Sequence, residues 1–215
     1  PLARVSLVHQ GYGLARLGRF GEAREALEQA IREDPLHADL ATLGLAFAAE
    51  CEGKYEEALE KYEEAMVRNP TLVYANLAVG RIRYEQGDYA AATAAYAKVG
   101  RDSRYFADQL YELVWTYIKQ GTYEEALRAV EVFLLAFPDH RYAAQLKVLR
   151  GHLHMKRQRY EAANTAYEKV VAEYSPIRDI AVSVGESREQ PRLFFERLAQ
   201  EDALEVLDKA GLPPF

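Results

Sequence analysis

The sequence predicts an all-α fold in which pairs of antiparallel helices repeat along the chain, and three observations lead to it. The pattern Gly-x-aromatic-x-x-Ala recurs about every 34 residues, which is typical of helical repeat proteins. Small residues recur where the two helices of each pair would cross, and a proline closes several of the pairs. The copies of the pattern lie at residues 18–23, 53–58, 87–92, 121–126 and 158–163, the last with glutamine in place of glycine.

Each repeat is expected to contain one helix before the pattern and one after it. The first-helix glycines Gly11, Gly80 and Gly151 should face Ala23, Ala92 and Ala163 on the second helices, so that the two helix axes can approach closely. The pattern glycine should end the first helix in a left-handed conformation without steric cost. Prolines 35, 70 and 138 should end the second helices or space the next ones. We expect units at about residues 4–36, 39–72, 73–106, 107–140 and 144–176, which together make an array over residues 1–176.

The period fails after Pro176, where a different organisation is expected for residues 177–215. Residues 177–190 are predicted to form either a loop or the decayed first helix of a sixth unit. Pro191 should open a helical stretch with Phe194 and Leu198 on one face. Because the last unit of an array must cover an otherwise exposed apolar face, this stretch is interpreted as a C-terminal capping helix. The chain begins with proline, so we expect it to be part of a longer protein.

The units resemble the tetratricopeptide repeat family over residues 4–176. The third and fourth units depart from its pattern at Arg104, where proline is expected, and at Val114, where glycine is usual. The resemblance implies a right-handed α-solenoid of about five units, a concave inner surface lined by the first helices, and protein binding. The matching positions are Leu7, Gly11, Leu14, Ala23, Leu27, Ala30 and Pro35 in the first unit; Ala46, Ala49, Ala58, Tyr62, Ala65 and Pro70 in the second; Gly80, Ala92, Tyr96 and Val99 in the third; and Leu113, Tyr117, Ala126, Phe133 and Pro138 in the fourth.

The fourth and fifth units are also similar to those of bacterial cell-envelope tetratricopeptide proteins, including outer-membrane assembly lipoproteins and gliding-motility scaffolds. The similarity lies in Trp115, Tyr117, Gly121, Tyr123 and the Phe-Pro-Asp run at 137–139 in the fourth unit, and in Ala163, Tyr167 and Tyr174 in the fifth. It implies a bacterial source, and it favours the periplasm or cell envelope slightly over the cytoplasm.

The family's inner surface, transferred to this chain, gives a candidate groove for a partner peptide or helix. Aromatic rings that recur along successive helices suit such a groove, although any one of these residues could instead belong to the core. The lysine and asparagine clamp that some relatives use to grip a terminal carboxylate is absent, which favours an apolar helix or an extended segment as the ligand. The candidate residues are Tyr12, Phe47, Tyr74, Leu77, Arg81, Tyr84, Tyr111, Trp115 and His152.

Charge is distributed unevenly along the chain. Residues 50–64 form an acidic shoulder with seven glutamates, whereas residues 140–160 contain no acidic side chain. Each region is interpreted as a solvated outer face or as an electrostatic docking surface for a partner or a second copy. The basic patch consists of Arg141, Lys147, Arg150, Lys156, Arg157 and Arg159.

Several functional classes are not favoured by the sequence. The net charge of −6 argues against nucleic acid as a partner, and no segment is long and apolar enough for direct membrane insertion. His152 and His154 are two residues apart on a helix and point to different sides, so no metal site is expected. Cys51 lacks a neighbouring base or resolving thiol, and no cofactor or catalytic motif is present. We therefore expect a non-enzymatic scaffold; the alternatives are a self-associating structural module and a regulatory domain of a longer protein.

Overall fold

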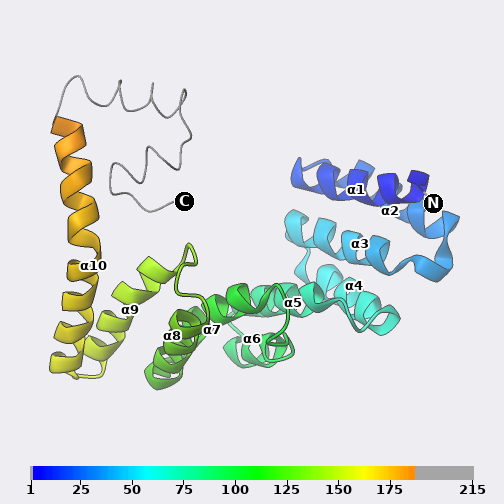
Figure 1. Cartoon of the computed structure of the whole chain (residues 1–215). Coiled ribbons are helices and arrows are strands. Elements are labelled where there is room, and N and C mark those ends of the chain that lie inside the picture. The colour runs from blue at the N-terminus through cyan, green and yellow to red at the C-terminus, as the bar shows by residue number, and fades with distance from the viewer. Residues whose placement is uncertain (1, 187–215) are drawn as a thin grey trace. The chain divides into compact units, whose positions relative to one another are not determined.

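A computed structural model describes residues 2–186, and these residues form α-helices, one short 3-10 turn and no strand (Figure 1). The predicted all-α repeat architecture is confirmed, while the predicted capping helix after Pro191 lies outside the described residues. The helices are α1 (Leu2–Arg16), α2 (Phe20–Glu33), α3 (Asp39–Glu52), α4 (Tyr55–Arg68), α5 (Val73–Glu85), α6 (Tyr89–Tyr96), α7 (Phe106–Gln120), α8 (Tyr123–Ala136), α9 (Ala143–Lys156) and α10 (Tyr160–Glu186), with the 3-10 turn η1 at Pro35–His37.

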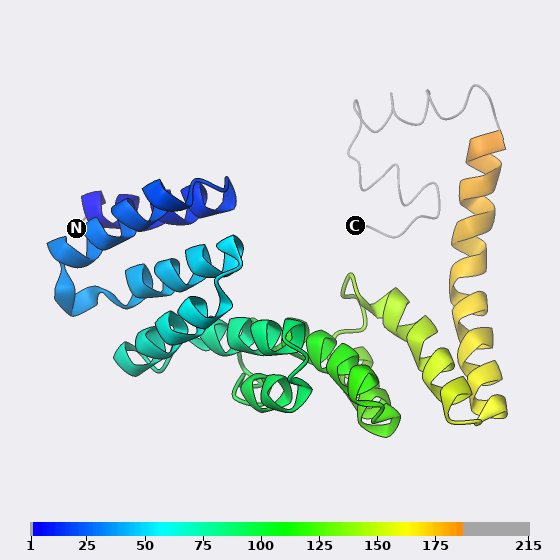
Figure 2. The same cartoon turned by 180° about the vertical axis from the view of Figure 1, so that it is seen from behind.

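The chain divides into two compact units, at Pro1–Pro138 and Asp139–Phe215. In the first unit, α1 packs against α2, α3 against α4, α5 against α6 and α7 against α8, and each pair contacts the next one (Figures 1 and 2). The described part of the second unit is the pair α9 and α10. None of the described helices is long and apolar enough to cross a membrane.

The turns between paired helices follow the expected chemistry. Gly53 and Gly121 adopt φ values of 81° and 75°, and the following amide donates to a carbonyl in the last turn of the first helix, Lys54 to Ala49 and Thr122 to Tyr117, each at 2.9 Å. The left-handed conformation has the lowest steric cost for glycine. In the fifth copy Gln158 adopts the same conformation, at φ 57°, so the turn keeps its geometry without glycine.

Glycines on the first helices allow close contact with the second helices, one turn beyond the predicted alanines. A Cβ built on Gly80 would lie 2.3 Å from the Tyr96 ring, and one on Gly151 would lie 2.3 Å from the Tyr167 ring. The predicted partner Ala92 is fully buried in the same cluster as Tyr96, but it is not the nearest neighbour of Gly80. The large ring therefore fills the space that each glycine leaves.

We expect Ala92→Leu to overpack this contact and to lower the free energy of unfolding by roughly 1–3 kcal/mol. Ala92 is 0% exposed and packs in one cluster with Leu77 and Tyr96. The matched control is Ala94→Leu on the exposed side of the same helix, which should change stability by a few tenths of a kcal/mol at most. Urea unfolding followed by circular dichroism measures both variants, and equal stabilities would contradict the packing described here.

The end of the last described helix differs from the prediction. The sequence period ends at Pro176, but α10 continues through this proline to Glu186. Proline removes one backbone donor, and at this exposed position water can satisfy the carbonyl that loses its partner. Residues 177–186 therefore form neither a loop nor a separate helix.

Candidate protein-binding face

The first helix of each pair in the first unit carries half-buried aromatic side chains that lie close to one another. Tyr12 of α1 and Phe47 of α3 have ring centroids 5.4 Å apart, and Tyr74 of α5 lies 5.6 Å from Tyr105, just before α7. On α7 itself, Tyr111 and Trp115 pack edge to face at 6.0 Å. We call the surface formed by the following residues the first-helix face: Tyr12, Phe47, Glu50, Tyr74, Arg81, Tyr111 and Trp115.

A common register places the main members of this face on the same side of successive helices. Tyr12, Phe47, Arg81 and Trp115 each precede the alanine of their repeat pattern by the same interval. Their helices occupy equivalent places in the stacked pairs of the first unit. The face therefore offers a similar side-chain position once in each of the four repeats.

Most of the predicted groove residues are accessible, with one clear exception. Leu77 is 1% exposed and belongs to the core cluster that contains Ala92 and Tyr96, so its prediction as a groove residue is wrong. Leu77 lies on the side of α5 that packs against α6 rather than on the open side. Half-buried positions are found for Tyr12, Phe47, Tyr74, Arg81, Tyr84, Tyr111 and Trp115.

Two of the predicted groove residues have surroundings that set them apart. Tyr84 packs edge to face on Tyr89 at 5.5 Å, at the turn between α5 and α6. His152 is exposed and belongs to the second unit, where its ring lies 5.6 Å from that of Tyr167 on α10. Neither is included in the first-helix face.

Glu50 is the residue of this face that sequence analysis placed elsewhere, in the acidic shoulder. Its carboxylate accepts a hydrogen bond from the hydroxyl of Tyr62, a fully buried side chain of α4. Burial raises the pKa of Glu50, and the Tyr62 hydrogen bond and the charge of Arg81 act in the opposite direction. Burial followed by the charge of Glu50 raises the pKa of Tyr62 and of Tyr74. Glu50 could have been found from its spacing, since it follows Phe47 by one turn on the same helix.

An ion pair connects the third and fourth repeats across the face. The Arg81 Nε of α5 lies 2.8 Å from a Glu112 carboxylate oxygen of α7, and both side chains are partly exposed. At such exposure the pair contributes little to stability. The pair matters for binding, because the positive charge of Arg81 is already balanced by Glu112 and is less available to a ligand carboxylate.

Cys51 is exposed next to Glu50, and its chemistry is that of a resting thiol. Burial and the negative charge of Glu50 raise the pKa of the Cys51 thiol, and the charge of Arg16 opposes them. A raised pKa keeps the sulfur protonated and poorly nucleophilic. Among the described residues, no group of three or more histidine, cysteine, aspartate or glutamate side chains could hold a metal ion.

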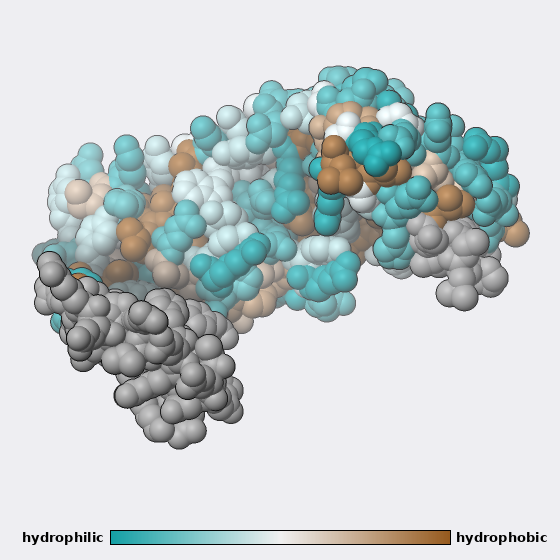
Figure 3. All heavy atoms as spheres, turned by 90° about the horizontal axis from the view of Figure 1, so that it is seen from above, coloured by the Kyte–Doolittle hydropathy of each residue, from teal (hydrophilic) through white to brown (hydrophobic). Residues whose placement is uncertain are grey.

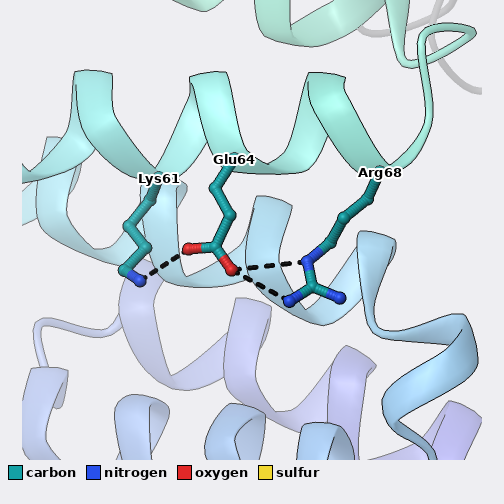
Figure 4. Close-up of polar contacts among 3 residues, drawn as sticks. All are labelled: Lys61, Glu64 and Arg68. Atoms are coloured by element: carbon teal, nitrogen blue, oxygen red, sulfur yellow. Dashed lines mark hydrogen bonds and ion pairs between the residues drawn. The ribbon is translucent and has the colours of Figure 1, made fainter.

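The acidic shoulder is partly neutralised by basic side chains. Glu64 accepts from Lys61 at 2.8 Å and from Arg68 at 3.1 Å on the same helix (Figure 4). Glu52 pairs with Arg24 and with Lys54. Hydrophilic residues also surround smaller apolar areas on the side of the molecule drawn in Figure 3. The shoulder is therefore a mixed-charge surface rather than a uniformly acidic one.

The predicted basic patch extends along α9 rather than gathering at one point. Arg141 precedes the helix and Arg159 follows it, and the 14 residues of α9 itself span roughly 21 Å. Lys147 forms an ion pair with Glu173 at 2.5 Å, and Arg141 stacks on Tyr142 with its guanidinium carbon 4.6 Å from the ring centroid. The structure thus engages Lys147 and Arg141 locally.

The raised pKa of Glu50 predicts an unusual pH dependence for Glu50→Gln. The pKa of Glu50 is raised above its ordinary value of 4.5, so the folded state holds this proton more tightly than the unfolded chain does. The stability that the bound proton contributes is lost as the pH rises through the folded pKa. We therefore expect Glu50→Gln to gain stability relative to the unmodified chain between about pH 4.5 and neutrality. Glu64, with a lowered pKa, contributes in the opposite sense below this window, and it does so equally in both proteins.

Urea unfolding of the two proteins across this pH range measures the difference. Glu60→Gln is the control, since Glu60 is exposed on α4. A stability difference between the Glu50→Gln variant and the unmodified chain that does not change with pH would contradict the assignment of the proton to Glu50.

Comparison with known proteins supports the repeat reading of the fold. Family models of the tetratricopeptide repeat match residues 9–72, 44–104 and 83–149. No curated protein sequence gives a significant match.

Similar solved structures include several of MamA. "Crystal structure of MamA protein" matches with a TM-score of 0.66 and 18% identity over 80% of this chain and 92% of that chain. "MamA RS-1 ArsTM double mutant" matches with a TM-score of 0.66 and 16% identity over 82% and 97%. "MamA 41-end from Desulfovibrio magneticus RS-1" matches with a TM-score of 0.64 and 16% identity over 79% and 94%. At these identities the likeness shows the fold alone.

Proposed function

The chain belongs to the tetratricopeptide repeat family, and we propose that it is a non-enzymatic scaffold that binds a protein segment on the first-helix face. The observation that carries this proposal is the set of half-buried rings that four successive first helices present on one side. Large, partly exposed aromatic side chains are the residues that most often anchor protein interfaces, because they bury much apolar area with little loss of side-chain freedom.

The proposed ligand is a helix or an extended segment with apolar side chains. Arg81, the cation on the third first helix, is paired with Glu112, so it is not available to grip a terminal carboxylate. Rings on successive helices instead suit side chains that recur along a bound segment. The repeated register of Tyr12, Phe47 and Trp115 offers such recurring contacts.

Affinity capture tests this proposal. The purified chain is immobilised and exposed to an extract of the source cell, and the same is done with a double variant, Tyr74→Ala with Trp115→Ala. The control is Tyr160→Ala, whose ring is 62% exposed in the second unit. We expect a protein that is retained by the unmodified chain and the control but not by the double variant. Equal retention by all three would exclude the first-helix face as the binding surface.

Self-association is a second candidate, favoured by apolar side chains that lie open to solvent in the first unit. Leu36, Val67 and Leu135 are 91%, 84% and 86% exposed. Such side chains could pack against a second copy. Light scattering of the unmodified chain and of Val67→Ser with Leu135→Ser separates the candidates, because a monomer in both cases would leave only binding of another protein.

The proposed setting is a bacterial envelope or motility assembly. It rests on the resemblance of the fourth and fifth units to envelope tetratricopeptide proteins, at Trp115, Tyr117 and Tyr123. Fractionation of the source cell, followed by immunodetection of the chain, tests this setting. Recovery from the cytoplasmic fraction alone would contradict it.

A further inference from the structure

The first-helix face has a carboxylate, Glu50, within a group of aromatic side chains from four helices. Tyr62 of α4 donates its hydroxyl hydrogen to this carboxylate from the buried side. Phe47 precedes Glu50 by one turn of α3 and packs against Tyr12 of α1. Burial, followed by the charge of Glu50, raises the pKa of Tyr74, which belongs to α5 of the third repeat. We propose, on the basis of the function proposed above, that this site receives a lysine or arginine side chain of the bound segment.

The chemistry of the site matches a cation in two respects. A partly buried carboxylate is costly unless it is paired. The Tyr62 hydroxyl supplies one hydrogen bond to Glu50, and a basic side chain would add the opposite charge. Aromatic ring faces also attract cations, most strongly where water is excluded. Phe47 supplies such a ring one turn before Glu50 on α3, Tyr12 packs against Phe47, and the charge of Glu50 acts on Tyr74.

One guanidinium of the chain already lies near this surface. The guanidinium carbon of Arg16, on α1, lies 6.0 Å from the ring centroid of Phe47. The other nearby cation, Arg81, is held by Glu112 on α7. Arg16 and an incoming basic side chain would therefore share one ring and repel each other, so that removal of Arg16 should strengthen binding.

Peptide selection tests the inference without a known partner. Short random peptides displayed on phage are selected on the full, purified chain, and the enriched peptides are synthesised. Their affinities are then measured by fluorescence anisotropy for the unmodified chain, for Glu50→Gln and for Glu60→Gln, an exposed glutamate on α4. Glutamine can still accept the Tyr62 hydrogen bond, so the variant removes the charge and keeps the packing.

We expect enriched peptides with a lysine or arginine at a shared position. Glu50→Gln should weaken them at least tenfold, Glu60→Gln less than twofold, and Arg16→Gln should tighten them. Replacing the shared basic residue of the peptide by glutamine should lower its affinity for the unmodified chain by the same factor of about ten. It should change the affinity for Glu50→Gln little, because both changes remove the same interaction.

The outcomes separate this inference from the function on which it rests. Peptides that are weakened by Tyr74→Ala but not by Glu50→Gln, or that carry no shared basic residue, would overturn the inference and leave the binding face in place. Peptides that ignore Tyr74→Ala and Trp115→Ala as well, or a library that yields no binder, would count against both. Selected peptides that compete with a second copy of the chain would assign the site to self-association instead.

Discussion

Replacing Tyr62 by alanine is expected to lower the free energy of unfolding by roughly 3–5 kcal/mol, the range for removal of a large buried ring. Tyr62 is 0% exposed and packs in one cluster with residues of α3 and α5, among them Ala46 and Ala78. Its loss would leave a cavity where two repeats meet and would remove the donor to Glu50. Urea unfolding followed by circular dichroism measures the change.

The matched variant Tyr62→Phe separates the ring from the hydroxyl. It keeps the packing and removes only the hydrogen bond to Glu50, so a smaller loss of about 1–3 kcal/mol is expected. Because each repeat contacts only its neighbours, both losses should appear first in the protection of α3, α4 and α5 amides against hydrogen exchange. Equal losses for the two variants, or changes confined to α7 and α8, would contradict the cluster around Tyr62.

The fold was largely predictable because its signals are local and periodic. Each pattern glycine marks a turn, since Gly53 and Gly121 adopt a conformation that few other residues tolerate. Each of the prolines at 35, 70 and 138 directly follows the C-cap residue of a second helix. The same reasoning fails at Pro176, because an exposed proline late in a long helix removes one hydrogen bond without stopping the helix.

The candidate site was only partly predictable, because its polar contacts join different helices. The register correctly indicated that Tyr12, Phe47 and Trp115 lie on first helices. It could not show that Arg81 reaches Glu112 of the next unit, or that Tyr62 of a second helix reaches Glu50. The prediction for Leu77 was wrong for a related reason. A shift of one residue around a helix moves a side chain from the open side to the core, and which side is buried depends on the helix that packs against it.

The second large effect is expected on binding, for Trp115→Ala. An aromatic anchor at the centre of an interface often contributes about 2 kcal/mol or more when truncated, which corresponds to roughly a thirtyfold loss of affinity. Trp115 is half-buried on α7 against Tyr111, within the first unit. It is the only tryptophan of the chain, so its fluorescence should report occupancy of the face directly. Titration of the unmodified chain with a selected peptide should shift that fluorescence.

Trp115→Phe is the matched variant, because it keeps an aromatic ring of smaller area at the same place. We expect it to weaken binding by less than Trp115→Ala, and we expect both variants to keep the helical content of the unmodified chain, since a half-buried side chain contributes less to the core than Val114 beside it, which is 0% exposed. Affinities from anisotropy and helical content from circular dichroism are measured on the same samples. If Trp115→Ala instead unfolded the first unit while the remaining folded fraction bound the peptide with unchanged affinity, Trp115 would be a core residue, and the binding surface would have to lie on Tyr12, Phe47 and Tyr74 alone.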